Sequence, residues 1–165
     1  MAEPIELFTP RAADYGSYEQ HLLEQYRLYV EMADRIAARR HTANTFFLTS
    51  NTAFVSFIAL TWAKDTGLSL RIALVFVAVA GAALCWTWYL LVRAYRDLST
   101  GKFAVIHKIE ERLPLRLYEY EWQVLGEGKD PTKYRPFTHV EAVVPRILAG
   151  VYAVMAVILT ALLFL

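Results

Sequence analysis

The sequence predicts an all-α integral membrane protein with three transmembrane helices, because three long stretches contain no Asp, Glu, Lys or Arg. The stretches run from His41 to Ala63, from Ile72 to Val92 and from Ile147 to Leu165. A helix of about twenty residues, at about 1.5 Å per residue, crosses the ~30 Å hydrocarbon layer of a bilayer. We therefore expect an antiparallel hairpin of two spans and a C-terminal span, with a long N-terminal cytoplasmic helix and a small helical cytoplasmic segment.

The composition agrees with a chain that is partly embedded and partly in water. Hydrophobic residues make up 56% of the 165 residues and charged residues 20%, which is too apolar for an ordinary soluble domain and too charged for complete burial in lipid. The net charge of +1 and the single cysteine, Cys85, argue against nucleic-acid binding, a disulfide framework and a cysteine-rich metal site. The first forty residues lack a basic segment followed by an apolar core, so we expect no cleavable signal.

The segments expected from this pattern follow one another without an internal repeat. They are an irregular tail (1–16), a cytoplasmic amphipathic helix (17–41), transmembrane helix 1 (42–63), transmembrane helix 2 (72–92), a cytoplasmic helical segment (93–146) and transmembrane helix 3 (147–165). Ser17 and Gln20 have capping-box spacing, and no Pro or Gly follows until Gly67, so one continuous helix is expected from stalk to span. Its apolar stripe, which includes Tyr26 and Tyr29, packs either on the same chain or on neighbouring copies.

Turn and helix-breaking residues divide the second half of the chain. Asp65, Thr66 and Gly67 predict the tight turn of the hairpin, and Ser99 to Gly101 predicts the end of the second long helix. A further helix should then end at Pro114, followed by a short helix over 115–125 and a loop over 126–136. Thr138 and Glu141 repeat the capping-box spacing before the last span, where Pro145 either begins or kinks the helix.

Basic residues near the span ends predict the orientation. They are Arg35, Arg39 and Arg40 before the first span, Arg93, Arg96 and Lys102 after the second, and Lys133, Arg135 and Arg146 before the third. The positive-inside rule then places the N-terminus and residues 93–146 in the cytoplasm and the C-terminus at the outer face. The residues expected at the membrane boundaries are Arg39, Arg40, Trp62, Trp86, Trp88, Arg93 and Arg146.

A polar face in the first span is the main candidate site. Thr45, Thr49, Thr52 and Ser56 recur at spacings of 4, 3 and 4 residues, which lays four hydroxyls along one helix face, and Asn44 and Asn51 lie beside it. Polar side chains in a span face other helices or water, so the face either forms interhelical hydrogen bonds or lines a pore between copies. An uncharged wall would pass water and small ions with little selectivity.

Enzymatic chemistry is not expected. His107, Glu110 and Glu111 supply one histidine beside two acids on a charged helix, which is a weak metal signal. The glycine-containing segment 126–130 lacks the other residues of a phosphate-binding loop, and no catalytic triad can be proposed from spacing. We expect no catalytic residues, no cofactor and no metal. Aromatic residues suited to binding a soluble partner are Tyr26, Tyr29, Tyr118, Tyr120 and Trp122.

Two runs of the sequence resemble parts of known membrane proteins. The run from Tyr26 to Ala53 resembles the stalk-to-span junction of small bacterial membrane proteins, and the run from Leu125 to Pro145, with Tyr134, Pro136, Thr138, His139 and Glu141, resembles their approach to the final span. In both of these runs, the sequence resembles the SLATT-like proteins that are encoded near antiphage systems. The resemblance implies a bacterial inner-membrane effector, triggered by a cytoplasmic sensor protein, that causes leakage or depolarisation.

Two functions remain open at this point. The first is a homo-oligomer in the lipid bilayer that perturbs or permeabilises the membrane on a cytoplasmic signal. The second is an anchor or scaffold without a channel, which holds a soluble cytoplasmic partner through its aromatic residues. The native mass of the extracted protein separates them, because the first predicts four or more copies and the second a bound soluble protein.

Overall fold

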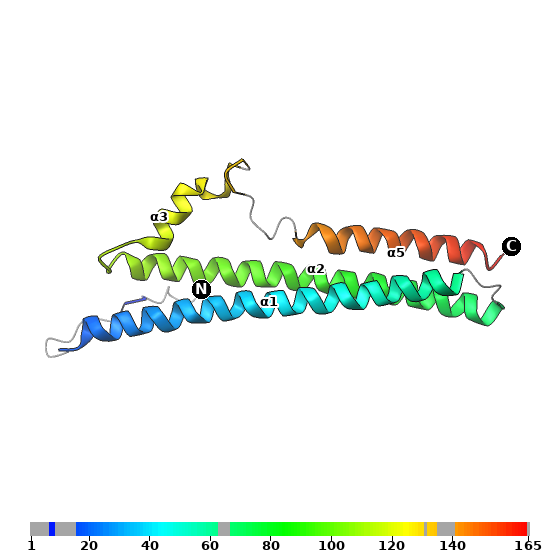
Figure 1. Ribbon diagram of the computed structural model, residues 1–165, viewed down its shortest axis with the longest axis horizontal. Coiled ribbons are helices and arrows are strands. Elements are labelled where there is room, and N and C mark those ends of the chain that lie inside the picture. The colour runs from blue at the N-terminus through cyan, green and yellow to red at the C-terminus, as the bar shows by residue number, and fades with distance from the viewer. Residues whose placement is uncertain (1–6, 9–15, 63–66, 131, 135–140, 165) are drawn as a thin grey trace, which may run out of the picture.

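The computed structural model describes residues 7–8, 16–62, 67–130, 132–134 and 141–164 of the 165-residue chain. Every regular element in these ranges is helical (Figure 1). The elements are α1 (Tyr18–Trp62), α2 (Leu68–Glu110), α3 (Leu117–Val124), the 3₁₀ turn η1 (Gly126–Gly128) and α5 (Val143–Ala161). The predicted all-α fold is confirmed, and α1, α2 and α5 are each long and apolar enough to cross a membrane.

The two longest helices form an antiparallel hairpin. α1 has 45 residues and α2 has 43, so each is roughly 65 Å long at 1.5 Å per residue, about twice the hydrocarbon thickness. Each therefore combines a span with an extension beyond it. We call the end of the molecule near Tyr18 and Glu110 the stalk end, and the end near Thr61 and Leu68 the hairpin end.

The predicted break between Ser99 and Gly101 is wrong, because α2 continues through these residues to Glu110. A glycine inside a helix costs only about 1 kcal/mol relative to alanine. The turns that follow Gly101 bury Lys102, Ile106 and Ile109, and the Lys102 ammonium lies 4.2 Å from the centre of the Tyr29 ring in α1. This packing against α1 outweighs the local preference of Gly101, so the second helix extends along the stalk.

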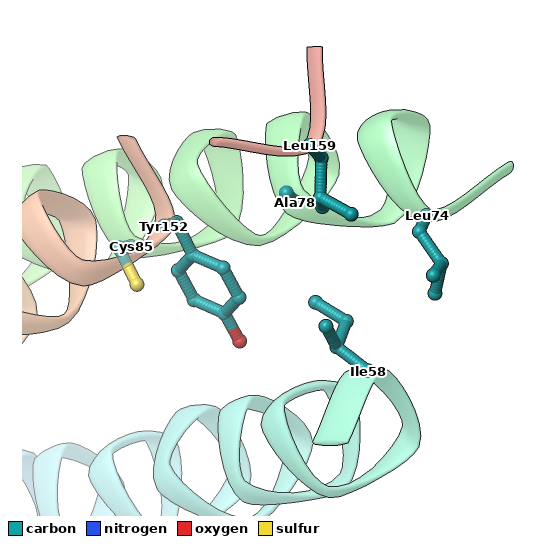
Figure 2. Packing of buried hydrophobic residues seen from close by; sticks show 6 residues of the cluster. All are labelled: Ile58, Leu74, Ala78, Cys85, Tyr152 and Leu159. Atoms are coloured by element: carbon teal, nitrogen blue, oxygen red, sulfur yellow. The ribbon is translucent and has the colours of Figure 1, made fainter. Parts of the chain in front are cut away.

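The third span lies along the hairpin half of α2 (Figure 1). Leu74, Ala78 and Cys85 of α2, Ile58 of α1, and Tyr152 and Leu159 of α5 form one buried cluster. Figure 2 shows Tyr152 pointing from α5 toward α1, and Ile58 pointing from α1 toward the other two helices. Since lipid is as apolar as these side chains, the cluster holds the helices together by close packing and hydrogen bonds.

A second cluster continues the contact toward the stalk end. It consists of Phe47, Trp88, Val92 and Ala142, and the rings of Phe47 and Trp88 stack with centroids 5.8 Å apart. At the hairpin end, Nη1 of Arg71 donates a 3.1 Å hydrogen bond to the carbonyl oxygen of Leu162. Contacts thus join the third span to the hairpin from Ala142 to Leu162.

Beyond the spans, the chain turns at the end of α2 into the short helix α3, close to the predicted 115–125. α3 extends away from the hairpin and is followed by η1, where Gly126, Glu127 and Gly128 have φ angles of 71°, 53° and 68° (Figure 1). Two glycines make this left-handed turn accessible. Pro145 is the third residue of α5, within its first turn, so it opens the helix. The predicted turn residues Asp65 and Thr66 and the predicted cap Thr138 lie outside the described residues.

Candidate functional site

The six polar residues predicted in the first span fall on two different faces of α1. Asn51 is 1% exposed and Asn44 is half-buried, whereas Thr45, Thr49, Thr52 and Ser56 are all exposed. Successive residues of an α-helix are about 100° apart, so Asn44 and Thr45 necessarily point in different directions. The two asparagines and the four hydroxyls therefore have to be considered separately.

The two asparagines make interhelical hydrogen bonds. Nε1 of Trp88 donates to Oδ1 of Asn44 at 2.8 Å, and Sγ of Cys85 donates to Oδ1 of Asn51 at 3.0 Å. The amide of Asn51 in turn donates to the carbonyl oxygen of Phe47 at 2.7 Å. These bonds satisfy the polar groups where water is absent, and they fix the register of α1 on α2.

The hydroxyl face, defined as Thr45, Thr49, Thr52 and Ser56, is exposed, and its side chains form no hydrogen bond to another helix within the described residues. Oγ1 of Thr45 donates to the carbonyl oxygen of His41 at 3.1 Å, and Oγ1 of Thr52 donates to that of Leu48 at 2.9 Å. Each hydroxyl has one donor and two lone pairs. The bonds to α1 use the donors, so the oxygens of Thr45 and Thr52 can still accept hydrogen bonds from outside the chain.

The residues predicted at the membrane boundary also separate into inward and outward positions. Trp86 is 61% exposed and its ring lies 5.7 Å from that of Tyr89, whereas Trp88 is 4% exposed and faces α1. Trp88 thus points between helices because its ring stacks on Phe47 and its N–H bonds to Asn44. The side chain of Trp62 lies outside the described part of the molecule.

The boundary arginines have different partners. Nε of Arg40 lies 3.7 Å from Oε2 of Glu141, a buried oxygen that accepts no hydrogen bond among the described residues, and Arg39 is exposed. Arg93 and Arg146 both lie over the ring of Tyr89, with Cζ 5.9 Å and 5.6 Å from its centre. The arginines gather where α1, α2 and α5 leave the charge-free stretches.

A buried carboxylate organises the stalk end. Glu110 is 0% exposed, and its Oε1 accepts hydrogen bonds from the Tyr26 hydroxyl at 2.9 Å and from the backbone N–H of Tyr118 at 3.1 Å. Its Oε2 accepts a bond from the N–H of Glu119 at 3.2 Å. The two N–H groups belong to the first turn of α3, so the carboxylate caps this helix and compensates its positive end. One side chain joins α1, α2 and α3.

This junction changes the acidity of its tyrosines. Burial, together with the hydrogen bond to Glu110 and its charge, raises the pKa of Tyr26 well above its usual range. Burial raises the pKa of Tyr118 as well, with a smaller contribution from the charge of Asp34. Both phenols therefore stay protonated at neutral pH, and Tyr26 can donate to Glu110.

The five aromatic residues predicted to bind a partner are unequally accessible. Tyr26 and Tyr29 contact Glu110 and Lys102 of the same chain, and the ring of Tyr118 lies 5.7 Å from that of Phe103. Tyr120 is 68% exposed, and Trp122 is exposed at one side while its ring meets that of Tyr134 at 6.4 Å. Of these five residues, Tyr120 and Trp122 are the two that present an accessible aromatic surface.

Sequence reasoning missed the roles of two residues that organise the structure, Glu110 and Tyr152. Glu110 was weighed only as a metal ligand, and no group of three His, Cys, Asp or Glu side chains in the described residues is arranged to hold a metal. Tyr152 appears in the sequence as one polar ring among apolar residues of a span, which is a signal for an interhelical hydrogen bond. Its partner lies 101 residues away, so the sequence does not reveal it.

Comparison with known proteins identifies the family of the chain. The family model described as the octameric membrane protein family (8xMP) matches residues 23–161. The chain belongs to the octameric membrane protein family. No curated protein and no solved structure matches it.

Membership in the 8xMP family makes the chain an oligomeric membrane protein, in agreement with the predicted homo-oligomer and with the three apolar helices. The matched residues include the hydroxyl face, the boundary arginines and the stalk-end junction. The expected identity with SLATT-like proteins is not confirmed, because the matching family is the 8xMP family.

Proposed function

We propose that this protein assembles as a homo-octamer in the bacterial inner membrane and permeabilises the membrane when a signal acts on its stalk end. The exposed hydroxyl face of α1 is the observation that carries the proposal. Membership in the 8xMP family supports assembly, and the description of that family supplies the number of copies.

The hydroxyl face supports the proposal because it is unsuited to contact with acyl chains. Polar side chains within a membrane face other helices or water. α2 and α5 pack on other sides of α1, through Asn44, Asn51 and Ile58. The four hydroxyls then face either a neighbouring copy or a path filled with water.

A ring of copies that present this face inward would form an uncharged polar path. The stretch from His41 to Ala63 contains no Asp, Glu, Lys or Arg, so nothing in it attracts one sign of ion strongly. Such a path dissipates gradients of small ions instead of selecting one. Depolarisation is therefore the expected consequence when the path opens.

The test compares hydroxyl-face variants with a matched control in another span. In the double variant Thr49→Leu, Thr52→Leu, we expect depolarisation of expressing cells to fall roughly tenfold or more, because apolar constrictions close water-filled paths by dewetting. Thr87→Leu is the control, since Thr87 is also an exposed span threonine whose hydroxyl donates to its own helix, at 3.0 Å to Ala83. A potential-sensitive dye gives the readout, and native mass in nanodiscs gives the number of copies.

The native mass of the double variant distinguishes a role in the pore from a role in assembly. An octamer that no longer depolarises cells supports a path along the hydroxyl face. An octamer of the double variant that depolarises cells as the native protein does contradicts it. Loss of the octamer in the double variant, but not in Thr87→Leu, would make the hydroxyl face a contact between copies instead.

The orientation is part of the proposal, with the stalk end in the cytoplasm as the basic residues predict. Cys85 is buried and is the chain's single cysteine, so one introduced thiol can be followed against a low background. Thr132→Cys places a thiol at an exposed position after η1. A membrane-impermeant maleimide should label it in lysed cells and not in intact spheroplasts; labelling in intact spheroplasts would reverse the orientation.

An antiphage effector role is the finer form of this proposal, and the resemblance to SLATT-like proteins supports it. A cytoplasmic sensor protein would act on the stalk end in an infected cell. Cells expressing the native chain with its genomic neighbours should stop growing early on phage challenge, and cells with the Thr49→Leu, Thr52→Leu variant should not. Equal growth of both cultures would exclude the effector role and would leave the proposed octameric assembly untouched.

The exposed aromatic side of α3 favours a second function, a scaffold for a soluble partner. Tyr120 and Trp122 are exposed residues of α3, which projects from the hairpin (Figure 1). Exposed aromatic residues are frequent anchors of interfaces. A soluble protein at constant stoichiometry that co-purifies with the native chain, and is lost in Tyr120→Ala, Trp122→Ala, would favour the scaffold over the pore.

A further inference from the structure

We propose that Tyr89, Arg93 and Arg146 form a binding site for the phosphate of an anionic phospholipid headgroup. Tyr89 and Arg93 lie on α2, and Arg146 lies on α5. Cζ of Arg93 is 5.9 Å, and Cζ of Arg146 is 5.6 Å, from the centre of the Tyr89 ring. Two guanidinium groups from different helices thus share one aromatic ring. The proposal is independent of the proposed pore.

These two positive charges lack a counter-charge within the described part of the chain. Neither Arg93 nor Arg146 forms an ion pair with a described carboxylate. Glu141, which precedes Arg146 by five residues, pairs with Arg40 instead, at 3.7 Å. A guanidinium stays protonated in proteins, so the site carries two uncompensated positive charges that repel each other until an anion joins them.

The arginine geometry is held by neighbouring groups. Nε of Arg146 donates a 2.8 Å hydrogen bond to the carbonyl oxygen of Ala142, which leaves the Nη groups free to bind elsewhere. The half-buried ring of Tyr89 packs against the cluster of Trp88 and Val92. Planar guanidinium groups bind phosphate oxygens through paired, charge-assisted hydrogen bonds. A phosphate between them would meet Arg146 held by its bond to Ala142 and Arg93 over the same ring.

The depth of the site favours a lipid phosphate. Arg71 lies at the hairpin end of the same helix, where it bonds to the carbonyl oxygen of Leu162. At 1.5 Å per residue the distance along α2 from Arg71 to Arg93 is about 33 Å, close to the ~30 Å hydrocarbon thickness. With Arg71 at one interface, Arg93 and Arg146 lie at the headgroup level of the other. Lipid phosphates are always present at that depth.

The experiment measures lipids retained by the full-length protein. The protein is placed in nanodiscs of phosphatidylcholine with a minor fraction of phosphatidylglycerol, released in the gas phase, and its bound lipids are counted by native mass spectrometry. Arg93→Gln, Arg146→Gln should retain anionic lipid at least about tenfold less, because charge-assisted bonds to both arginines are lost. The control Arg27→Gln, Arg96→Gln removes the same charge from two exposed positions outside the site and should retain phosphatidylglycerol as the native protein does.

A single variant and a competition with inorganic phosphate complete the experiment. Arg93→Gln alone removes one contact with the Tyr89 ring and keeps the hydrogen bond of Arg146 to Ala142, so it is used if the double variant does not assemble. It should also reduce retained phosphatidylglycerol. Equal retention by the native protein and the site variants overturns the proposal. Displacement of phosphatidylglycerol by millimolar inorganic phosphate, with no preference over phosphatidylcholine, overturns the lipid assignment and makes the site one for soluble phosphate.

Discussion

The hydroxyl of Tyr152 in α5 donates a 3.1 Å hydrogen bond to the main-chain oxygen of Asn51 in α1, across 101 residues of sequence. The side chain of the same asparagine accepts a bond from the thiol of Cys85 in α2. All three spans therefore meet at Asn51. Because acyl chains offer no hydrogen-bond partner, these polar contacts define one arrangement of the helices among many of similar apolar packing.

Gly81 makes this contact possible, which leads to the first prediction. A Cβ atom added at Gly81 would overlap the Tyr152 ring, so Gly81→Ala should displace the ring and lower the free energy of unfolding by about 1–3 kcal/mol. Gly150→Ala is the matched control, since Gly150 is also a helical glycine of a span but has no atom within 4 Å of an added Cβ. Thermal unfolding in detergent, followed by circular dichroism, should show a large loss for Gly81→Ala and none for Gly150→Ala.

The second prediction concerns the hydrogen bond itself. Tyr152→Phe preserves the buried ring but removes the donor to Asn51, and such bonds contribute about 0.6 kcal/mol on average between membrane helices, up to about 1.7. We expect a correspondingly small loss of stability and an unchanged fold. A combined Tyr152→Phe, Gly81→Ala variant measured by the same unfolding assay should lose less than the sum of the two single variants, because both act on one ring. If the two losses of unfolding free energy simply add, Gly81 and Tyr152 do not act through one contact.

The sequence was sufficient to predict the helices and insufficient to predict which faces meet. Charge-free length and the absence of Pro and Gly in α1 are local properties, so the spans and the long first helix could be read directly. α2 passes through Gly101 because the contact of Lys102 with Tyr29 of α1 and the burial of Ile106 outweigh the low helix propensity of glycine, and propensity rules do not include such packing.

The polar face of the first span shows the same limit at the level of single residues. Asn44 and Thr45 are neighbours in sequence, yet Asn44 bonds to Trp88 while Thr45 is exposed. Helical spacing predicts that they point in different directions, but the direction of α2 depends on contacts from residues 34 or more positions away. The role of Glu110 is still harder to predict, because its hydrogen-bond partners lie in α1 and in the first turn of α3.

The third prediction concerns the cap that Glu110 provides. Glu110→Gln retains the size of the side chain but replaces one carboxylate oxygen with an amide NH2, which cannot accept a hydrogen bond, so one of the two α3 N–H groups loses its acceptor. The lost charge-assisted bond and the unpaired N–H should cost about 1.5–3 kcal/mol locally. We expect α3 to detach while α1 and α2 remain folded. Limited proteolysis should then cleave between Glu111 and Arg116 faster than in the native protein.

A matched acid indicates whether this effect is specific. Glu111 is the next residue, is exposed, and pairs with Lys108 at 2.8 Å on the surface. Glu111→Gln removes the same charge and should leave the cleavage rate unchanged, because exposed ion pairs contribute little. Equal acceleration in both variants would show that α3 depends on the charge of the segment and not on the Glu110 cap.

The last prediction uses the raised pKa of Tyr26. Burial, the hydrogen bond to Glu110 and the charge of Glu110 keep its hydroxyl protonated above the pH at which an exposed tyrosine ionises, about 10. The folded chain therefore binds this proton more tightly than the unfolded chain does. The contribution of Tyr26 to stability is complete below pH 10 and declines as the pH rises beyond it, with a slope of at most about 1.4 kcal/mol per pH unit.

The free energy of unfolding, measured between pH 8 and 11.5, should show a steeper alkaline loss for the native protein than for Tyr26→Phe. Tyr120→Phe, which removes an exposed tyrosine of α3, should keep the native slope, and equal slopes for native protein and Tyr26→Phe would exclude Tyr26 as the source.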